Sequence, residues 1–132
     1  MARAQWPLQQ GRPTLEVILT HAKSGQKVVR TLLADTGAGA EHDQFEFVLD
    51  GVDCVLCGGI PFRTVAVGGA YSGVYPAFSL PIEIPALGFS DLVFAVGISP
   101  PPLDFDGIAC FRFLNRFTYG NFGNKGEFAL EA

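Results

Sequence analysis

Leu32-Leu33-Ala34-Asp35-Thr36-Gly37-Ala38-Gly39 is the stretch that concentrates the information in this sequence. Three apolar residues end a predicted strand, and an acid, a hydroxyl and two glycines follow. Glycine permits turns and a close backbone approach that other residues resist. The turn therefore fixes a carboxylate at a strand end, near backbone N–H groups that can bond it. The alternative is an ordinary strand-to-turn corner in which Asp35 only caps the turn.

The composition favours a single all-β domain over residues 1–132. The chain has 16 Gly, 9 Pro and 12 Phe, which is typical of many turns between short aromatic strands. Its net charge of −4, with no basic cluster, argues against a nucleic-acid partner. No apolar run approaches the ~20 residues that cross a bilayer, and the N-terminus lacks a signal peptide. We therefore expect no membrane partner and a cytoplasmic location.

The three cysteines are Cys54, Cys57 and Cys110, and their odd number argues against a disulfide framework. Cys54 and Cys57 have the spacing of zinc and redox motifs. A zinc site needs two more ligands, however, and the two histidines, His21 and His42, are not spaced as a pair. We expect free thiols, with no metal and no cofactor.

The first half of the chain predicts an extended arm followed by paired strands. Residues 1–13 form the arm, and residues 14–21 and 26–34 form a hairpin that leads to Asp35. Further on, Asp50-Gly51 predicts a turn between strands at 45–49 and 52–56. A short helix within residues 41–49 is the competing prediction.

The glycine-rich segment 68–73 lies between two apolar strands, 63–67 and 74–78. A tip with so few side chains to anchor it should move. It is either a mobile functional hairpin or a surface hairpin without a role. Strands at 79–84 and 92–96 follow, and the continuous apolar run predicts that the second is buried.

Near the C-terminus, Asp106-Gly107 precedes a segment in which Ile108, Phe111 and Leu114 recur near helical spacing. This spacing predicts one short helix with a crowded apolar side. A last alternating strand ends the chain.

Taken in order, these pieces resemble the single-domain, retroviral-type (retropepsin-like) aspartic proteases, and among them the bacterial gag-polyprotease-like branch. Asp-Thr-Gly-Ala at 35–38 resembles their catalytic loop, the glycine-rich hairpin their flap, and Asp106-Gly107-Ile108 with its helix their second signature. The resemblance spans about residues 14–130 and implies a small closed β-barrel with a flap hairpin and one short C-terminal helix. Cys110 stands where the family has a glycine.

The resemblance also implies an aspartic endopeptidase that cleaves peptide or protein substrates as a homodimer at mildly acidic pH. One Asp-Thr-Gly supplies one carboxylate, so Asp35 of each subunit would meet its copy at a two-fold axis. The terminal arms, residues 3–10 and 128–132, would share a sheet between subunits. The residues implied in catalysis are Asp35, Thr36 and Gly37, and those implied in substrate binding are Ala38, Gly39, Gly68, Gly69 and Ala70.

Two other classes of protein stay open at this point. One is a catalytically silent retropepsin-like domain that dimerises or binds peptides, which the departure at Cys110 motivates. The other is an unrelated β-barrel binding domain.

Overall fold

Ten strands and two short α-helices make up most of residues 2–101 and 104–132, the part of the chain that this computed structural model describes. The strands are β1 (Arg3–Pro7), β2 (Thr14–Thr20), β3 (Lys27–Ala34), β4 (Phe47–Leu49), β5 (Arg63–Val67), β6 (Gly73–Ile84), β7 (Phe89–Gly97), β8 (Gly107–Ala109), β9 (Thr118–Gly120) and β10 (Glu127–Glu131). The helices are α1 (Gly51–Gly58) and α2 (Phe111–Leu114), and two 3₁₀ turns are η1 (Gly69–Tyr71) and η2 (Pro85–Leu87).

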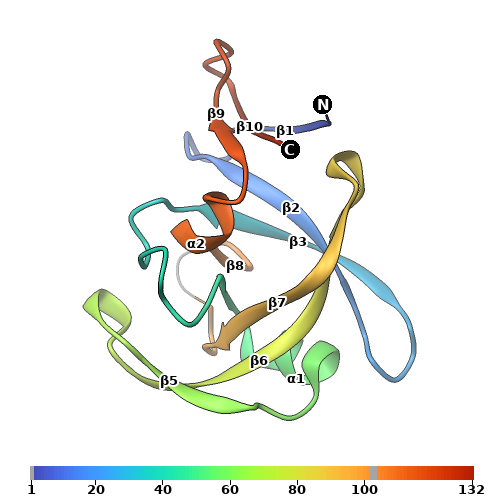
Figure 1. Cartoon of the computed structure of the whole chain (residues 1–132), viewed down its shortest axis with the longest axis vertical. Helices are drawn as coiled ribbons and strands as arrows, with labels where there is room; N and C mark the ends of the chain where they lie inside the picture. Colours follow the sequence, from blue (N-terminus) through green and yellow to red (C-terminus); the bar gives the residue numbers. More distant parts are fainter. Residues whose placement is uncertain (1, 102–103) are drawn as a thin grey trace.

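Six strands close into a barrel in the order β2-β3-β8-β4-β7-β6, and β6 pairs back onto β2 through Leu19 and Ile82. The β3–β8 and β4–β7 pairs are parallel, while the other pairs in the ring are antiparallel. Strand β5 lies outside this ring and pairs with β6 alone. The expected all-β closed barrel is confirmed (Figure 1).

Two of the three predicted hairpins are present. Strands β2 and β3 pair from Thr14–Leu33 to Thr20–Lys27, and β3 leads directly to Asp35. Strands β5 and β6 pair up to Val67–Gly73, and their hairpin reaches away from the barrel (Figure 1). Strand β6 continues without a break to residue 84, so the two strands predicted at 74–78 and 79–84 are one.

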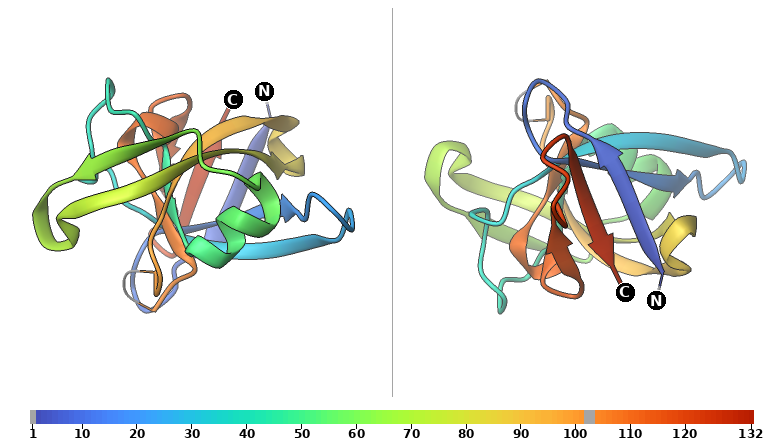
Figure 2. Two further views of the ribbon diagram at one scale, coloured as in Figure 1. Left: turned by 90° about the horizontal axis from the view of Figure 1, so that it is seen from below. Right: turned by 90° about the horizontal axis from the view of Figure 1, so that it is seen from above.

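The two terminal arms pair with each other inside one chain. Strands β1, β10 and β9 form a separate three-stranded sheet, in which Arg3 lies opposite Glu131 and forms an ion pair with it at 2.7 Å. Figure 2 shows the two chain ends side by side. A sheet between subunits would therefore have to use the outer edges, β1 and β9, because β10 is already paired on both sides.

The predicted hairpin around Asp50-Gly51 is wrong, and so is the competing helix within residues 41–49. Residues 51–58 form helix α1, a second helix that the sequence did not indicate, while β4 occupies residues 47–49. Asp50 caps α1, since its carboxylate accepts a hydrogen bond from the Val52 N–H at 3.0 Å. The helix turns Asp53, Cys54 and Cys57 inward and leaves Val52 and Val55 exposed. The valines therefore do not mark a buried strand, as the prediction assumed.

Helix α1 is tied to the barrel by a two-point ion pair. The Nε and Nη2 of Arg30 on β3 donate to the two carboxylate oxygens of Asp53 at 2.8 and 3.0 Å. Asp53 is only 6% exposed, so its charge depends on this partner. The ion pair also raises the pKa of Arg30, which keeps the guanidinium charged.

We expect Arg30→Ala to lower the free energy of unfolding by about 2 kcal/mol, because it leaves a buried carboxylate without its cation. Urea denaturation measures this change. The matched control is Lys27→Ala, which removes an exposed pair with Glu83 on the same sheet and should cost at most about 1 kcal/mol. Equal losses in the two variants would contradict the anchoring role of Arg30.

The second signature divides into a strand and one helical turn. Strand β8 lies between β3 and β4, and α2 follows immediately. Phe113 on α2 is fully buried, with its ring centroid 4.5 Å from that of Phe47 and 5.3 Å from that of Phe117. The helix is shorter than the segment with helical spacing, because residues 107–109 extend to pair with both neighbours.

The core consists of two clusters. The larger fills the barrel, and the smaller gathers residues such as Leu33, Val48 and Ile108 on the side where Asp35 lies. Strand β7 contributes Val93 and Ala95 to the larger cluster but leaves Leu92 and Phe94 exposed, so its predicted complete burial is wrong. None of the described helices is long and apolar enough to cross a membrane.

Candidate active site

Asp35 lies at the end of β3, where the parallel pairing with β8 fixes its backbone. The Asp35 N–H donates to the Ala109 carbonyl at 3.0 Å, continuing the ladder that joins Ala34 and Ala109. The carboxylate Oδ1 accepts a hydrogen bond from the Gly37 N–H at 2.9 Å. Asp35 is half-buried and Thr36 is exposed. The loop thus holds a carboxylate in a fixed place while leaving it accessible.

The far side of this loop is anchored as firmly. The Phe111 N–H donates to the Ala38 carbonyl at 2.9 Å, and the Ala40 N–H donates to the Asp43 carboxylate at 2.7 Å. Gly39 has a φ of +76°, and a Cβ there would lie 2.7 Å from the Asp43 carboxylate. The turn therefore needs glycine at position 39.

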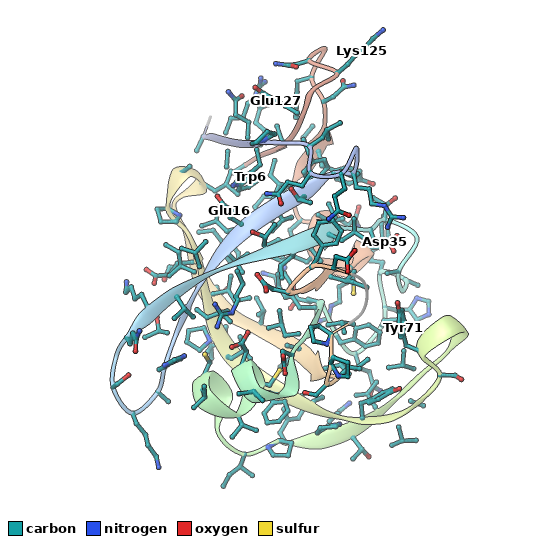
Figure 3. All side chains as sticks on the ribbon, turned by 180° about the vertical axis from the view of Figure 1, so that it is seen from behind. Trp6, Glu16, Asp35, Tyr71, Lys125 and Glu127 are labelled. Carbon is teal, nitrogen blue, oxygen red and sulfur yellow. The ribbon has the colours of Figure 1, made fainter. Side chains whose placement is uncertain are left out.

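A cleft of about 540 Å³ separates the Asp35 loop from the tip of the β5–β6 hairpin. We call it the Asp35 cleft. It is lined by Asp35, Gly37, Ala38, Gly39, Asp43, Phe45, Val48, Ala66, Val67, Gly68, Gly69, Tyr71, Ile98, Ile108 and Cys110. In Figure 3, Asp35 and Tyr71 lie on the same side of the molecule, at the two walls of this cleft.

The structure brings most of the predicted site residues to one place. Asp35, Gly37, Ala38 and Gly39 form one wall, and Gly68 and Gly69 form part of the other. Ala70 lies in η1, the turn at the hairpin tip. Thr36 is next to the cleft but does not line it, because it faces solvent beside Asp35.

Sequence reasoning missed the floor of the cleft. Phe45, Val48, Ile98 and Ile108 come from segments far apart in the sequence, and each has the pattern of an ordinary core residue. Asp43 also lines the cleft, and its carboxylate accepts the Ala40 N–H. No local pattern distinguishes these positions.

Cys110 is accommodated without displacing the Asp35 loop. It is 1% exposed, packs in the smaller core cluster, and its φ of −87° is one that any residue adopts. Its N–H donates to the Glu46 carbonyl at 2.9 Å. Burial raises the pKa of the Cys110 thiol to about 12, and the charges of Asp35 and Asp43 contribute to this rise. The thiol is thus protonated and inert at neutral pH.

The Asp35 cleft is lined by two carboxylates, those of Asp35 and Asp43, and each accepts one backbone N–H. Asp43 accepts the Ala40 N–H three residues before it in the loop, and Asp35 accepts the Gly37 N–H at the end of β3. No group of three metal-ligating side chains occurs in the described part of the chain. Cys54 and Cys57 are buried free thiols on α1, and burial raises the pKa of both.

No protein-family model matches this sequence, and none of the curated proteins is detectably similar to it in sequence. Among solved structures, the chain is similar to a retropepsin-like aspartic protease from Rickettsia conorii. The two share 16% sequence identity with a TM-score of 0.51, and the match covers 93% of this chain and 95% of the other. Such a low identity establishes the fold alone. The chain therefore has the fold of the retropepsin-like aspartic proteases, as the resemblance of its motifs implied.

Proposed function

We propose that this protein is an aspartic endopeptidase that acts as a homodimer, with Asp35 of each subunit in one shared site. The observation that carries this proposal is the accessible Asp35 carboxylate on its glycine loop. Asp35 is held on a glycine loop at the wall of a 540 Å³ cleft, and the sequence holds one such Asp-Thr-Gly loop. Hydrolysis by paired carboxylates needs two such groups, so a second subunit has to supply the other.

In the proposed dimer the two Asp35 carboxylates lie roughly 3 Å apart and share one proton, because two like charges so close cannot both persist. The ionised carboxylate takes a proton from a bound water as the water oxygen adds to the scissile carbonyl carbon. The protonated carboxyl gives its proton to the carbonyl oxygen, which yields a tetrahedral diol. The amide nitrogen then takes the proton acquired from water, and the C–N bond breaks. One diol hydroxyl returns its proton to the other carboxylate, which restores the starting pair.

The neighbouring residues have positioning roles in this mechanism. The Gly37 N–H orients the Asp35 carboxylate from within the chain at 2.9 Å. Ala38 and Gly39 are small, so a substrate backbone can approach the loop closely. Gly68, Gly69 and Ala70 of the hairpin tip would cover the substrate. Thr36 is exposed beside Asp35 and in the proposed dimer would contact the partner's loop.

Cys110 does not favour the alternative of a silent binding domain, since the Asp35 loop keeps its hydrogen bonds to Ala109 on one side and Phe111 on the other. We therefore retain the endopeptidase as the proposed function.

The test is cleavage of a mixed peptide library at mildly acidic pH, followed over a range of protein concentrations, with sedimentation of the same samples. We expect the rate per chain to rise with concentration and to level off where the dimer saturates. A monomer that cleaves with a constant rate per chain would contradict the shared site. A stable dimer that cleaves nothing would contradict the endopeptidase.

A further inference from the structure

The Asp35 cleft continues along β5 as two smaller hollows. The second hollow, of about 330 Å³, shares Asp43, Phe45 and Ala66 with the Asp35 cleft. The third, of about 160 Å³, shares His42, Asp43 and Gln44 with the second. Residues of β5 line all three hollows, from Val67 next to the hairpin tip to Arg63 at the start of the strand. Strand β5 is the outermost strand of its sheet. The three hollows therefore form one groove along a free strand edge.

The third hollow has a composition unlike the rest of the groove. Phe62 and Phe94 lie with their ring centroids 5.3 Å apart, and an arginine guanidinium lies over each ring. The Cζ of Arg63 is 5.4 Å from the Phe62 ring, and that of Arg112 is 5.7 Å from the Phe94 ring. We call these four side chains, Phe62, Arg63, Phe94 and Arg112, the arginine pocket.

The guanidiniums of Arg63 and Arg112 have N–H donors that are not bonded to any described residue. Arg112 uses one N–H, from Nη1 to the Asp43 carbonyl at 2.6 Å, and Arg63 makes no side-chain hydrogen bond within the described residues. Neither forms an ion pair with a described carboxylate, in contrast to Arg3, Arg30 and Arg116. A guanidinium presents five N–H donors in a flat fork that matches a carboxylate.

The arginine pocket is positive, because two guanidiniums and one carboxylate, that of Asp43, line its hollow. His42 and Asp43 are the titratable residues that line the same hollow besides the two arginines. The Asp43 carboxylate is bonded to the Ala40 N–H, 2.7 Å away. Phe62 and Phe94 are half-exposed, so their rings form an apolar floor that an incoming side chain can cover.

We propose that the arginine pocket selects substrates with an acidic side chain three to four residues from the scissile bond. This inference rests on the proposed function for the identity of the ligand as an extended peptide. A strand advances about 3.3 Å per residue, and Arg63 lies three residues along β5 from Ala66 and four from Val67, which line the Asp35 cleft. A peptide lying along β5 therefore places a side chain at the arginine pocket when its scissile bond lies near Asp35.

The test measures binding with the inactive Asp35→Asn variant and cleavage of the same peptides with the wild-type protein. Fluorescein-labelled ten-residue peptides, alike except for a Glu or a Gln at each position in turn, are titrated against full-length Asp35→Asn protein, followed by fluorescence anisotropy. We expect the Glu peptide to bind about three- to fivefold more tightly at one stretch of positions, as for a half-exposed ion pair. Adding Arg63→Gln should remove this preference, Arg63→Lys should retain part of it, and high salt should weaken it.

The matched control is Lys125→Gln, which removes one positive charge at the tip of the β9–β10 hairpin, far from the groove (Figure 3). It should leave the preference intact. Equal binding of Glu and Gln peptides, or a preference that survives Arg63→Gln in a folded protein, would overturn the inference. If the wild-type protein cleaves nothing while the preference depends on Arg63, the proposed function fails and the acidic-peptide pocket stands. If the wild-type protein cleaves the peptides but binds Glu and Gln peptides equally, the proposed function stands and the inference about the arginine pocket fails.

Discussion

Replacing Asp35 with Asn should abolish cleavage, with kcat/KM at least about 1,000-fold below that of the wild-type protein. In the proposed homodimer this substitution removes both carboxylates at once. Neither the group that takes the proton from water nor the group that protonates the carbonyl oxygen remains. The measurement is the cleavage rate of a peptide that the wild-type protein cuts, at the pH of its highest activity.

The Asp35→Asn variant should remain folded, which separates loss of chemistry from loss of structure. The Asn side-chain oxygen can still accept the hydrogen bond from the Gly37 N–H. The backbone contact from Asp35 to Ala109 does not involve the side chain. The matched control is Asp91→Asn, an exposed carboxylate on β7 outside the described hollows, and it should cleave at the wild-type rate.

Mixing the wild-type protein with the Asp35→Asn variant tests whether the site is shared. A mixed dimer holds one Asp35 carboxylate and, from the variant subunit, one amide that cannot act as an acid or a base. Such dimers should be inactive, so an excess of the variant should suppress wild-type activity below the value expected from dilution. Suppression by dilution alone would contradict a site built from both subunits.

The Asp35 loop, the β2–β3 hairpin and the β5–β6 hairpin were predictable from the sequence because each is a local feature. The turn at Gly37 to Gly39 depends on residue types within five positions, and the hairpins depend on alternating strands next to turn residues. The barrel itself was implied by a resemblance in the order of the motifs, not by any single segment.

Helix α1 was not predictable in this way, since its fold is decided by a distant residue. The segment Val52 to Leu56 is rich in β-branched and apolar residues, which favours a strand. In the structure its polar Asp53 points inward because Arg30, on a strand 23 residues earlier, neutralises it. Tertiary contact overrides local propensity here.

The floor of the Asp35 cleft escaped prediction for a related reason. Phe45, Ile98 and Ile108 belong to three segments that meet only when β4, β7 and β8 lie side by side. In the sequence each one is an ordinary hydrophobic residue. The arginine pocket is similar, because Arg63 and Arg112 come from distant segments and share a hollow only through Phe62 and Phe94.

Gly107→Ala should be the most destabilising of the small substitutions, lowering the free energy of unfolding by about 4 kcal/mol or more. Gly107 begins β8 and is buried between Leu32 of β3 and Leu49 of β4. A Cβ there would overlap the backbone carbonyl oxygen of Val48 and lie 3.1 Å from Leu49 Cδ2 and 3.2 Å from Leu32 Cδ2. A carbonyl in a strand cannot rotate away as a side chain can, so the strands have to separate.

The same substitution should also reach the Asp35 site, since β8 carries the Ala109 carbonyl that accepts the Asp35 N–H. Urea denaturation followed by circular dichroism measures the stability, and cleavage below the denaturation range measures the site. The matched control is Gly126→Ala in the β9–β10 hairpin, where an added Cβ meets nothing nearer than the Asn124 side chain at 3.5 Å. It should change the stability by no more than about 0.5 kcal/mol. If Gly107→Ala cost no more stability than Gly126→Ala, the close packing of β8 between β3 and β4 would be contradicted. Position 107 would then not require glycine.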